Sequence, residues 1–196
     1  MRDRALSGFR PECTIGRQIN TYIKWALTDA NIHNRPNSIP LYAVYAMRGS
    51  QNSRTALNIL NHRLVTLANR YREAWRVRPS VEGVSEPTTG GATTPTECYL
   101  HRKFPVITGF LICGPMVAIL TLDSSPVSNP DIPPDTAGKF ISRFDFGQEG
   151  QDVWNALAVA ICVIRVRKNM LELIEDFPDD PMWTIEEKLD LSDPDI

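Results

Sequence analysis

The residues of this chain that best suit phosphate chemistry form a short basic cluster, His101, Arg102 and Lys103, directly before an apolar segment. An imidazole, a guanidinium and an ammonium can together neutralise and hydrogen-bond phosphate oxygens. These three residues are therefore a candidate site for a phosphate or a partner. The competing interpretation is a solvated basic patch that binds nothing.

A second set of cations lies on a predicted helix that begins after Asn52 or Ser53, the two candidates for its N-cap. Its apolar residues recur at steps of three and four and predict one buried face: Leu57, Leu60, Leu64, Leu67 and Tyr71. The opposite face is expected to carry Arg54, Asn61, Arg63, Arg70 and Arg72, with Arg76 and Arg78 beyond the helix.

This basic face is a candidate surface on which Arg63 and Arg70 contact phosphate or partner groups. Nucleic acid would bind through its phosphates, but a pI of about 5.9 and the spread of the arginines around the helix disfavour it. An acidic protein partner or the acidic C-terminal tail fits better. The charge is indeed divided: residues 1–103 carry 15 Lys+Arg against 7 Asp+Glu, whereas residues 172–196 carry ten acids and one lysine.

Other patterns of catalytic residues are missing from the sequence. His33 and His62 have no acid or cysteine at a spacing that would form a metal pair, and the four cysteines are far apart without a C-x-x-C motif. Neither a G-x-S-x-G elbow nor a G-x-x-x-x-G-K-[ST] loop occurs. We therefore expect no metal, cofactor or disulfide framework. Reduced cysteines favour an intracellular location, cytoplasmic or nuclear, and the lack of an apolar run of about 20 residues predicts no membrane partner.

The hydrophobic pattern predicts one α/β domain over residues 18–177, preceded by a lead-in segment, 1–17, and followed by an acidic tail, 178–196. Strands are expected at 18–27, 39–47, 106–113, 116–122 and 139–146, and helices at about 53–75 and 151–175. The first half of the second helix is apolar around most of its circumference, so we expect it to be buried. Gly114 and Pro115 do not match the usual two-residue hairpin preference, and residues 78–96 read as a flexible loop.

Five segments carry a family resemblance: SIPLYAVYAMRG, RTALNILNHRLVTL, FPVITGFLICGPMVAILTLD, GKFISRFDFG and QDVWNALAVAICVIRVRKNMLELI. In their order and texture they resemble the PD-(D/E)XK nuclease-like domains of fungal proteins, over roughly residues 18–174. The resemblance implies a restriction-endonuclease-like fold, in which a mixed β-sheet is flanked by two long helices.

The family's reaction uses an aspartate and a glutamate to hold Mg²⁺ and a lysine two residues after the glutamate. The resemblance places the Glu-x-Lys positions on residues 46–48 and the upstream acid near residues 24–25. Ala46 has no ligand atom, so the metal site is expected to be degenerate. Arg48 could still bind a phosphate, and Asp29 could substitute as the acid. These two residues are the catalytic candidates that the resemblance implies.

Two classes of function remain open at this point. The first is a non-catalytic or repurposed nuclease-like domain that acts as an interaction or accessory protein. The second is an enzyme, either a Mg²⁺-dependent nuclease with a non-standard metal site or a repurposed enzyme that needs no metal. Only the nuclease would require Mg²⁺.

Overall fold

The computed structural model describes residues 10–32, 38–49, 51–76, 104–129 and 138–176. They form three helices and four strands, in the order α1 (Pro11–Asp29), β1 (Tyr42–Ala46), α2 (Ser53–Ala74), β2 (Val106–Cys113), β3 (Met116–Asp123), β4 (Lys139–Asp145) and α3 (Asp152–Asp176). The loop expected at 78–96 and the tail at 178–196 lie outside the described residues.

The four strands form one mixed sheet in the order β1-β2-β3-β4. β1 runs parallel to β2, so the chain must cross over between them, and α2 lies in this connection. β2, β3 and β4 form an antiparallel meander. The sheet confirms the general α/β class that the sequence predicts.

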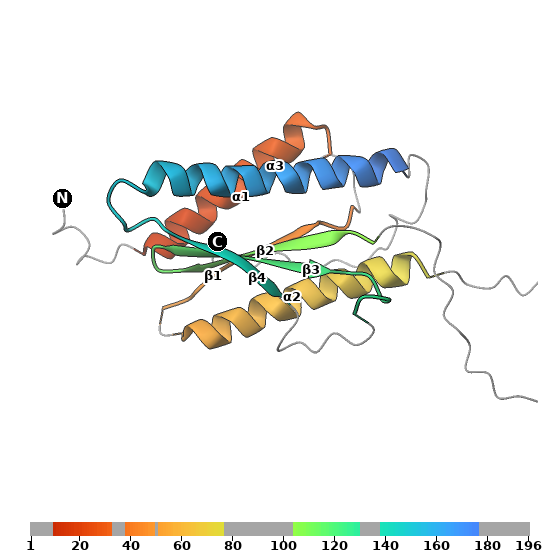
Figure 1. The fold of residues 1–196 in the computed structure, drawn as a ribbon, viewed down its shortest axis with the longest axis horizontal. Coiled ribbons are helices and arrows are strands. Elements are labelled where there is room, and N and C mark those ends of the chain that lie inside the picture. Colours follow the sequence, from red (N-terminus) through yellow and green to blue (C-terminus); the bar gives the residue numbers. More distant parts are fainter. Residues whose placement is uncertain (1–9, 33–37, 50, 77–103, 130–137, 177–196) are drawn as a thin grey trace, which may run out of the picture.

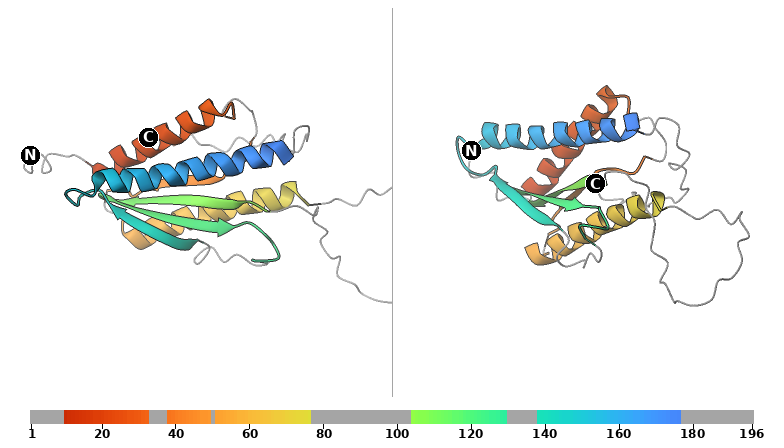
Figure 2. Two further views of the ribbon diagram at one scale, coloured as in Figure 1. Left: turned by 45° about the horizontal axis from the view of Figure 1, so that its top comes forward. Right: turned by 45° about the vertical axis from the view of Figure 1, so that its right-hand side comes forward.

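Helices cover both faces of this sheet, as Figures 1 and 2 show: α2 lies on one face, and α1 and α3 lie together on the other. Three helices thus flank the sheet, where the resemblance implied two. α2 packs closely on β2 because Gly109 has no side chain; a Cβ there would lie 3.1 Å from Leu64 Cδ1 and 3.2 Å from Leu60 Cδ2. The core lies on both faces of the sheet, under α2 on one side and under α1 and α3 on the other.

The strand predicted at residues 18–27 is wrong, because these residues belong to α1. The helix begins at Pro11, within the segment 1–17, with proline in its first turn and Glu12 beside it. Ile19, Ile23 and Leu27 recur every four residues and are all buried. The same ten residues also alternate as a strand would, and the burial of one helical face decides between the two patterns.

Three further details differ from the sequence-based expectations. Asn61 is 2 % exposed rather than on the solvent face of α2. Gly114 and Pro115 do form a two-residue turn, in which Cys113 pairs with Met116. Gly114 has φ +59 at the first central position, the conformation of a II′ turn, and this turn leaves the second position to a residue with negative φ such as proline. The first half of α3 is largely exposed instead of buried.

Other expectations for α2 and for the last strand are confirmed. Asn52 is the N-cap of α2, and its side chain accepts a hydrogen bond from the Thr55 N–H at 2.7 Å. The predicted leucine face is buried at Leu60, Leu64 and Leu67 and half-buried at Leu57. The strand expected at 139–146 is β4, an edge strand with mostly exposed residues.

Candidate anion-binding site

A cavity of about 270 Å³ lies where β1 ends, between the start of α1 and the middle of α2. It is lined by three segments of the chain: Arg10, Cys13, Gly16, Arg17 and Asn20 from α1 and its cap, residues 44–48 from β1 and the turn after it, and Arg63 from α2. We refer to this cavity as the β1 pocket. Ligand pockets for drug-sized molecules start near 300 Å³, so its size suits a small chemical group.

The α1 wall of the pocket depends on a close approach between α1 and β1. A Cβ on Gly16 would lie 3.3 Å from the Cβ of Ala46 and 3.4 Å from Ile112 Cδ1. The helix can therefore lie almost directly on the strand at this point. Arg10, Cys13, Arg17 and Asn20 follow one another at steps of three and four, so they share the face of α1 that borders the cavity.

The α2 wall is a single arginine held by two contacts. Arg63 Nη1 donates a hydrogen bond to the carbonyl oxygen of Val44 at 3.0 Å, and its guanidinium lies over the ring of Tyr45, 5.1 Å from the centroid. β1 is one of the two edge strands of the sheet. Arg63 thus caps a backbone carbonyl of this edge and at the same time brings its charge to the pocket.

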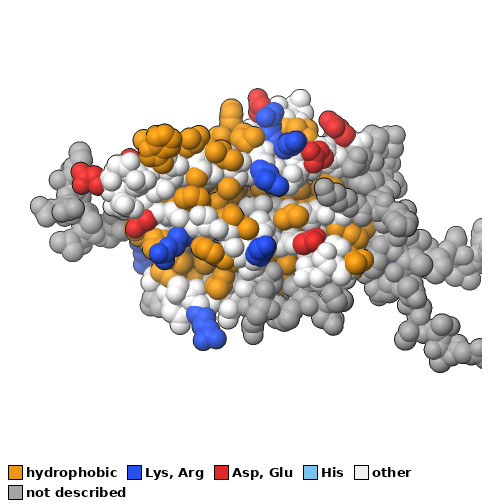
Figure 3. All heavy atoms as spheres, in the orientation of Figure 1, with side chains coloured by type: hydrophobic (Ala, Val, Ile, Leu, Met, Phe, Trp, Pro, Cys, Tyr) orange, Lys and Arg blue, Asp and Glu red, His pale blue; other side chains and the backbone are white. Residues whose placement is uncertain are grey.

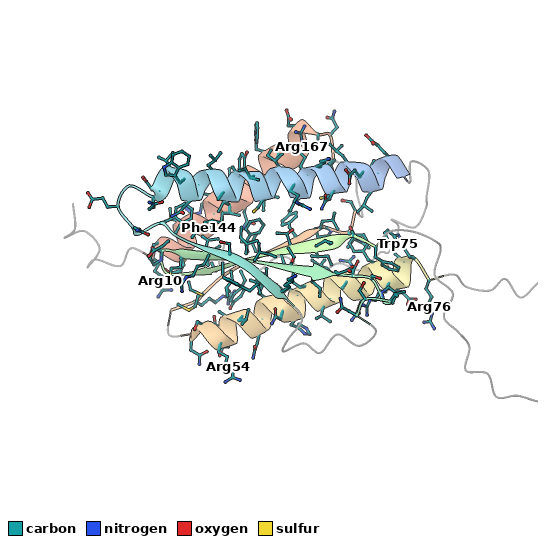
Figure 4. The ribbon with its side chains drawn as sticks, in the orientation of Figure 1. Arg10, Arg54, Trp75, Arg76, Phe144 and Arg167 are labelled. Atoms are coloured by element: carbon teal, nitrogen blue, oxygen red, sulfur yellow. The ribbon has the colours of Figure 1, made fainter. Side chains whose placement is uncertain are left out.

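The segment after β1 lines the pocket with Met47 and Arg48. Gln51 Oε1 accepts hydrogen bonds from the Tyr45 hydroxyl at 2.8 Å and from the Arg48 N–H at 3.3 Å, which holds the turn against the strand. Gly49 has φ +29, and the guanidinium of Arg10 lies beside it, because a Cβ at Gly49 would be 3.6 Å from Arg10 Nη2. Figure 4 shows Arg10 at this end of the sheet, whereas Arg54 lies on the outer side of α2.

The charge of the pocket is strongly one-sided. Four of the lining residues are arginines (Arg10, Arg17, Arg48 and Arg63), and no described lining residue is an aspartate or glutamate. Four guanidinium groups around one small cavity repel one another, and a bound anion would reduce this repulsion. Guanidinium groups also match the oxygens of phosphate and carboxylate in a bidentate geometry. The arrangement can therefore bind an anionic group.

The residues expected to act as a catalytic pair lie apart. Arg48 lines the β1 pocket, whereas Asp29 ends α1 and forms an ion pair with Arg167 of α3 at 2.8 Å. Asp29 follows Gly16 by 13 positions, about 20 Å along a helix. Within the described part of the chain, no three His, Cys, Asp or Glu residues gather where they could hold a metal ion.

The other predicted cations have separate positions. Arg63 lines the pocket, Arg70 is half-buried on α2, and His101, Arg102 and Lys103 lie outside the described residues. Arg72 donates to the carbonyl oxygens of Ser124, Ser125 and Asn129. The basic face of α2 is therefore partly used for contacts within the protein.

Arg10, Arg17 and Asn20 were not identified as site residues from the sequence, because the segment that carries them was assigned to a lead-in and a strand. The signal that identifies them is the four-residue recurrence of Ile15, Ile19 and Ile23 after a proline. That pattern predicts a helix and so places the arginines on one of its faces.

Comparisons with protein-family models, with curated proteins and with solved structures found no match to this chain. Among the described residues, none of the helices combines the length and the hydrophobicity needed to cross a bilayer.

Proposed function

We propose that this chain is a non-catalytic binding domain, which holds a phosphate-type anion of its ligand or partner in the β1 pocket. The observation that carries the proposal is the composition of the pocket, which has four arginines and no carboxylate among its described lining residues. Hydrolysis with Mg²⁺ requires carboxylate ligands at the reacting phosphate, whereas retention of a phosphate requires only donors and positive charge.

The nuclease-like resemblance supports the same site. Its three signature positions, residues 46–48, all line the β1 pocket. Ala46 stands where the family has a metal-binding glutamate, and Arg48 stands where it has a lysine. We therefore propose a restriction-endonuclease-like ancestry in which the phosphate-binding part of the site is kept and the metal-binding part is lost.

The size of the pocket restricts the ligand to a small terminal group. A single phosphate fits the role better than a nucleobase or a polymer backbone, because the cavity is small. The ligand class is accordingly a phosphate monoester or inorganic phosphate, and a phosphorylated partner would present the same group.

Calorimetric titration with inorganic phosphate at low ionic strength tests the proposal. We expect binding that weakens as salt is added and that weakens about tenfold in Arg17→Gln, because a charge-assisted hydrogen bond contributes about 1.5–3 kcal/mol. Arg54→Gln is the matched control, since Arg54 is exposed on α2 outside the pocket. Equal affinity in the wild type and Arg17→Gln, or no binding at all, contradicts the proposal.

A parallel titration with Mg²⁺ or Mn²⁺ addresses the nuclease alternative. Saturable metal binding together with cleavage of a phosphodiester substrate would establish the enzyme and overturn the non-catalytic proposal. Phosphate binding that is unchanged by either metal supports the binding domain.

A further inference from the structure

The N-terminal half of α3 exposes an unusual amount of apolar surface. Val153, Trp154, Leu157, Ile161 and Ile164 are 70 %, 67 %, 50 %, 61 % and 41 % exposed. From residue 153 to residue 164 the helix has no charged side chain, although solvent-facing helix surfaces normally carry charges. Figure 3 shows hydrophobic side chains gathered over this part of the molecule.

Four of these residues have the spacing of a helix-pairing seam. Trp154, Leu157, Ile161 and Ile164 follow at steps of three, four and three, the a/d pattern by which two helices pack together. We call these four residues the outer seam. A second seam at similar steps is buried in this protein: Val159, Val163, Val166, Met170 and Leu173. At 3.6 residues per turn the two seams lie on opposite faces of α3, so the core covers one and no described residue buries the other.

We propose that a second copy of this chain covers the outer seam, through an antiparallel pair of α3 helices. In this pair Leu157 of one copy packs against Ile161 of the other, and Trp154 packs against Ile164. The seam is therefore complementary to itself under a two-fold axis, which is what a symmetric dimer contact requires. Ala158 and Ala160 flank the seam and let the two helices approach closely.

The charges at the ends of the seam select the antiparallel direction. Lys168 lies four residues beyond Ile164 on the same face and is exposed. In the antiparallel register it faces the turn before the partner's α3, which carries the exposed Glu149. In a parallel pair Lys168 would face its own counterpart, and the two like charges would repel. The exposed ion pair of Lys168 with Glu172, at 3.7 Å, contributes little and does not prevent the new contact.

The acidic C-terminal tail is a less suitable occupant. Residues 177–196 carry seven acids and one lysine. The turn and first residue that precede the outer seam are themselves acidic, at Glu149 and Asp152, so they would repel this segment. A second copy instead offers an apolar seam together with a cation at the matching position.

Sedimentation analysis of the full chain tests the proposal over a range of protein concentrations. We expect a monomer–dimer equilibrium, and a dissociation constant about thirtyfold or more higher in Ile161→Glu, the effect of losing a central contact residue. Ile161 is mostly exposed, so the variant should fold, which circular dichroism checks. Ala156→Glu is the matched control, because it adds the same charge to an exposed position of the same helix away from the seam. It should dimerise like the wild type.

A charge exchange tests the direction of the pair. Glu149→Lys and Lys168→Glu should each weaken the dimer, and the double variant should restore it. In a parallel pair the neutral variant Lys168→Gln would remove the repulsion of the two lysines, so a dimer that Lys168→Gln strengthens shows parallel pairing and contradicts the register. A wild-type chain that stays monomeric at every concentration overturns the proposal. A dimer that Ile161→Glu leaves intact also overturns it.

Discussion

The hydrogen bond from Arg63 Nη1 to the carbonyl oxygen of Val44, at 3.0 Å, joins the middle of α2 to the open edge of the sheet. Since β1 has only one neighbouring strand, Val44 belongs to an edge that would otherwise expose its backbone groups. The same side chain lies over Tyr45 and lines the β1 pocket. One arginine therefore has a role in stability and a role in the proposed binding.

Arg63→Met should lower the free energy of unfolding by about 1–2 kcal/mol, because it removes a charged hydrogen bond and a cation–π contact. It should also weaken phosphate binding. Urea denaturation measures the first effect and calorimetry the second. Arg54→Met, at an exposed position of the same helix, should change stability by no more than about 0.5 kcal/mol. A similar loss in both variants would mean that the Arg63 contacts contribute nothing specific.

Gly16→Val should destabilise the protein by about 1–3 kcal/mol, since the new side chain must enter the contact with Ala46 and Ile112. Ala46→Gly makes room on the strand side. The double variant should therefore recover part of the loss, which a double-mutant cycle from urea denaturation measures. Strictly additive effects of the two substitutions would show that the close approach of α1 to β1 is not tightly packed.

Tyr71 should make the protein less stable in alkali. Its hydroxyl donates to the Ile39 carbonyl oxygen at 2.6 Å, and complete burial raises the pKa of this hydroxyl far above its ordinary value of 10.0. The folded protein therefore keeps the proton where the unfolded chain releases it. The stabilisation is complete below about pH 10 and falls above it by up to about 1.4 kcal/mol per pH unit.

Comparison with Tyr71→Phe isolates this effect from other groups that titrate in alkali. The variant lacks the hydroxyl and its hydrogen bond, so it should be less stable than the wild type at neutral pH. The difference in stability between the two proteins should shrink as the pH rises above 10. Denaturant titrations at several pH values provide the measurement. A difference that stays constant through this range would argue against a buried, protonated Tyr71.

Cys13 should be the described thiol that is alkylated first. It is exposed and lines the β1 pocket, whereas Cys113 and Cys162 are half-buried and burial raises the pKa of both thiols, which lowers their thiolate fraction. In a Cys98→Ser background, peptide mass spectrometry after iodoacetamide treatment gives the order of reaction. Inorganic phosphate should slow only the reaction at Cys13, and faster labelling of Cys113 would contradict the described burial.

The sequence predicts the parts of the fold in which one pattern fits one element. The apolar runs around Gly114 can only be central strands, and the leucines of α2 fit only a helix. Residues 18–27 fit both periods, and the decision depends on the sheet face that buries Ile19 and Ile23. The exposed seam of α3 could not be predicted, because an apolar residue has the same sequence signal whether its own core or another molecule covers it.

Only part of the site could be predicted, because local sequence patterns place some of its residues and not the others. Arg48 and Arg63 belong to the unit of strand, turn and helix that the sequence indicates clearly, and both line the pocket. Arg10 and Arg17 reach the pocket only because α1 lies on β1, which is a contact between two segments that no local pattern connects. Asp29 seemed close to the site only while the segment before it, residues 18–27, was assigned to a strand.

β1 pairs with residues that lie far from it in the chain. Tyr42, for example, pairs with Thr108, 66 positions later. The antiparallel pairs β2–β3 and β3–β4 are joined by much shorter segments of the chain. Closing a long segment costs conformational entropy before any pairing is gained, so the edge strand should dock last and detach first. Its amide protons should then exchange with deuterium sooner than those of β2 and β3. An anion that bridges α1, β1 and α2 would hold this strand in place, and occupancy of the pocket would become visible as slower exchange along the sheet's first edge.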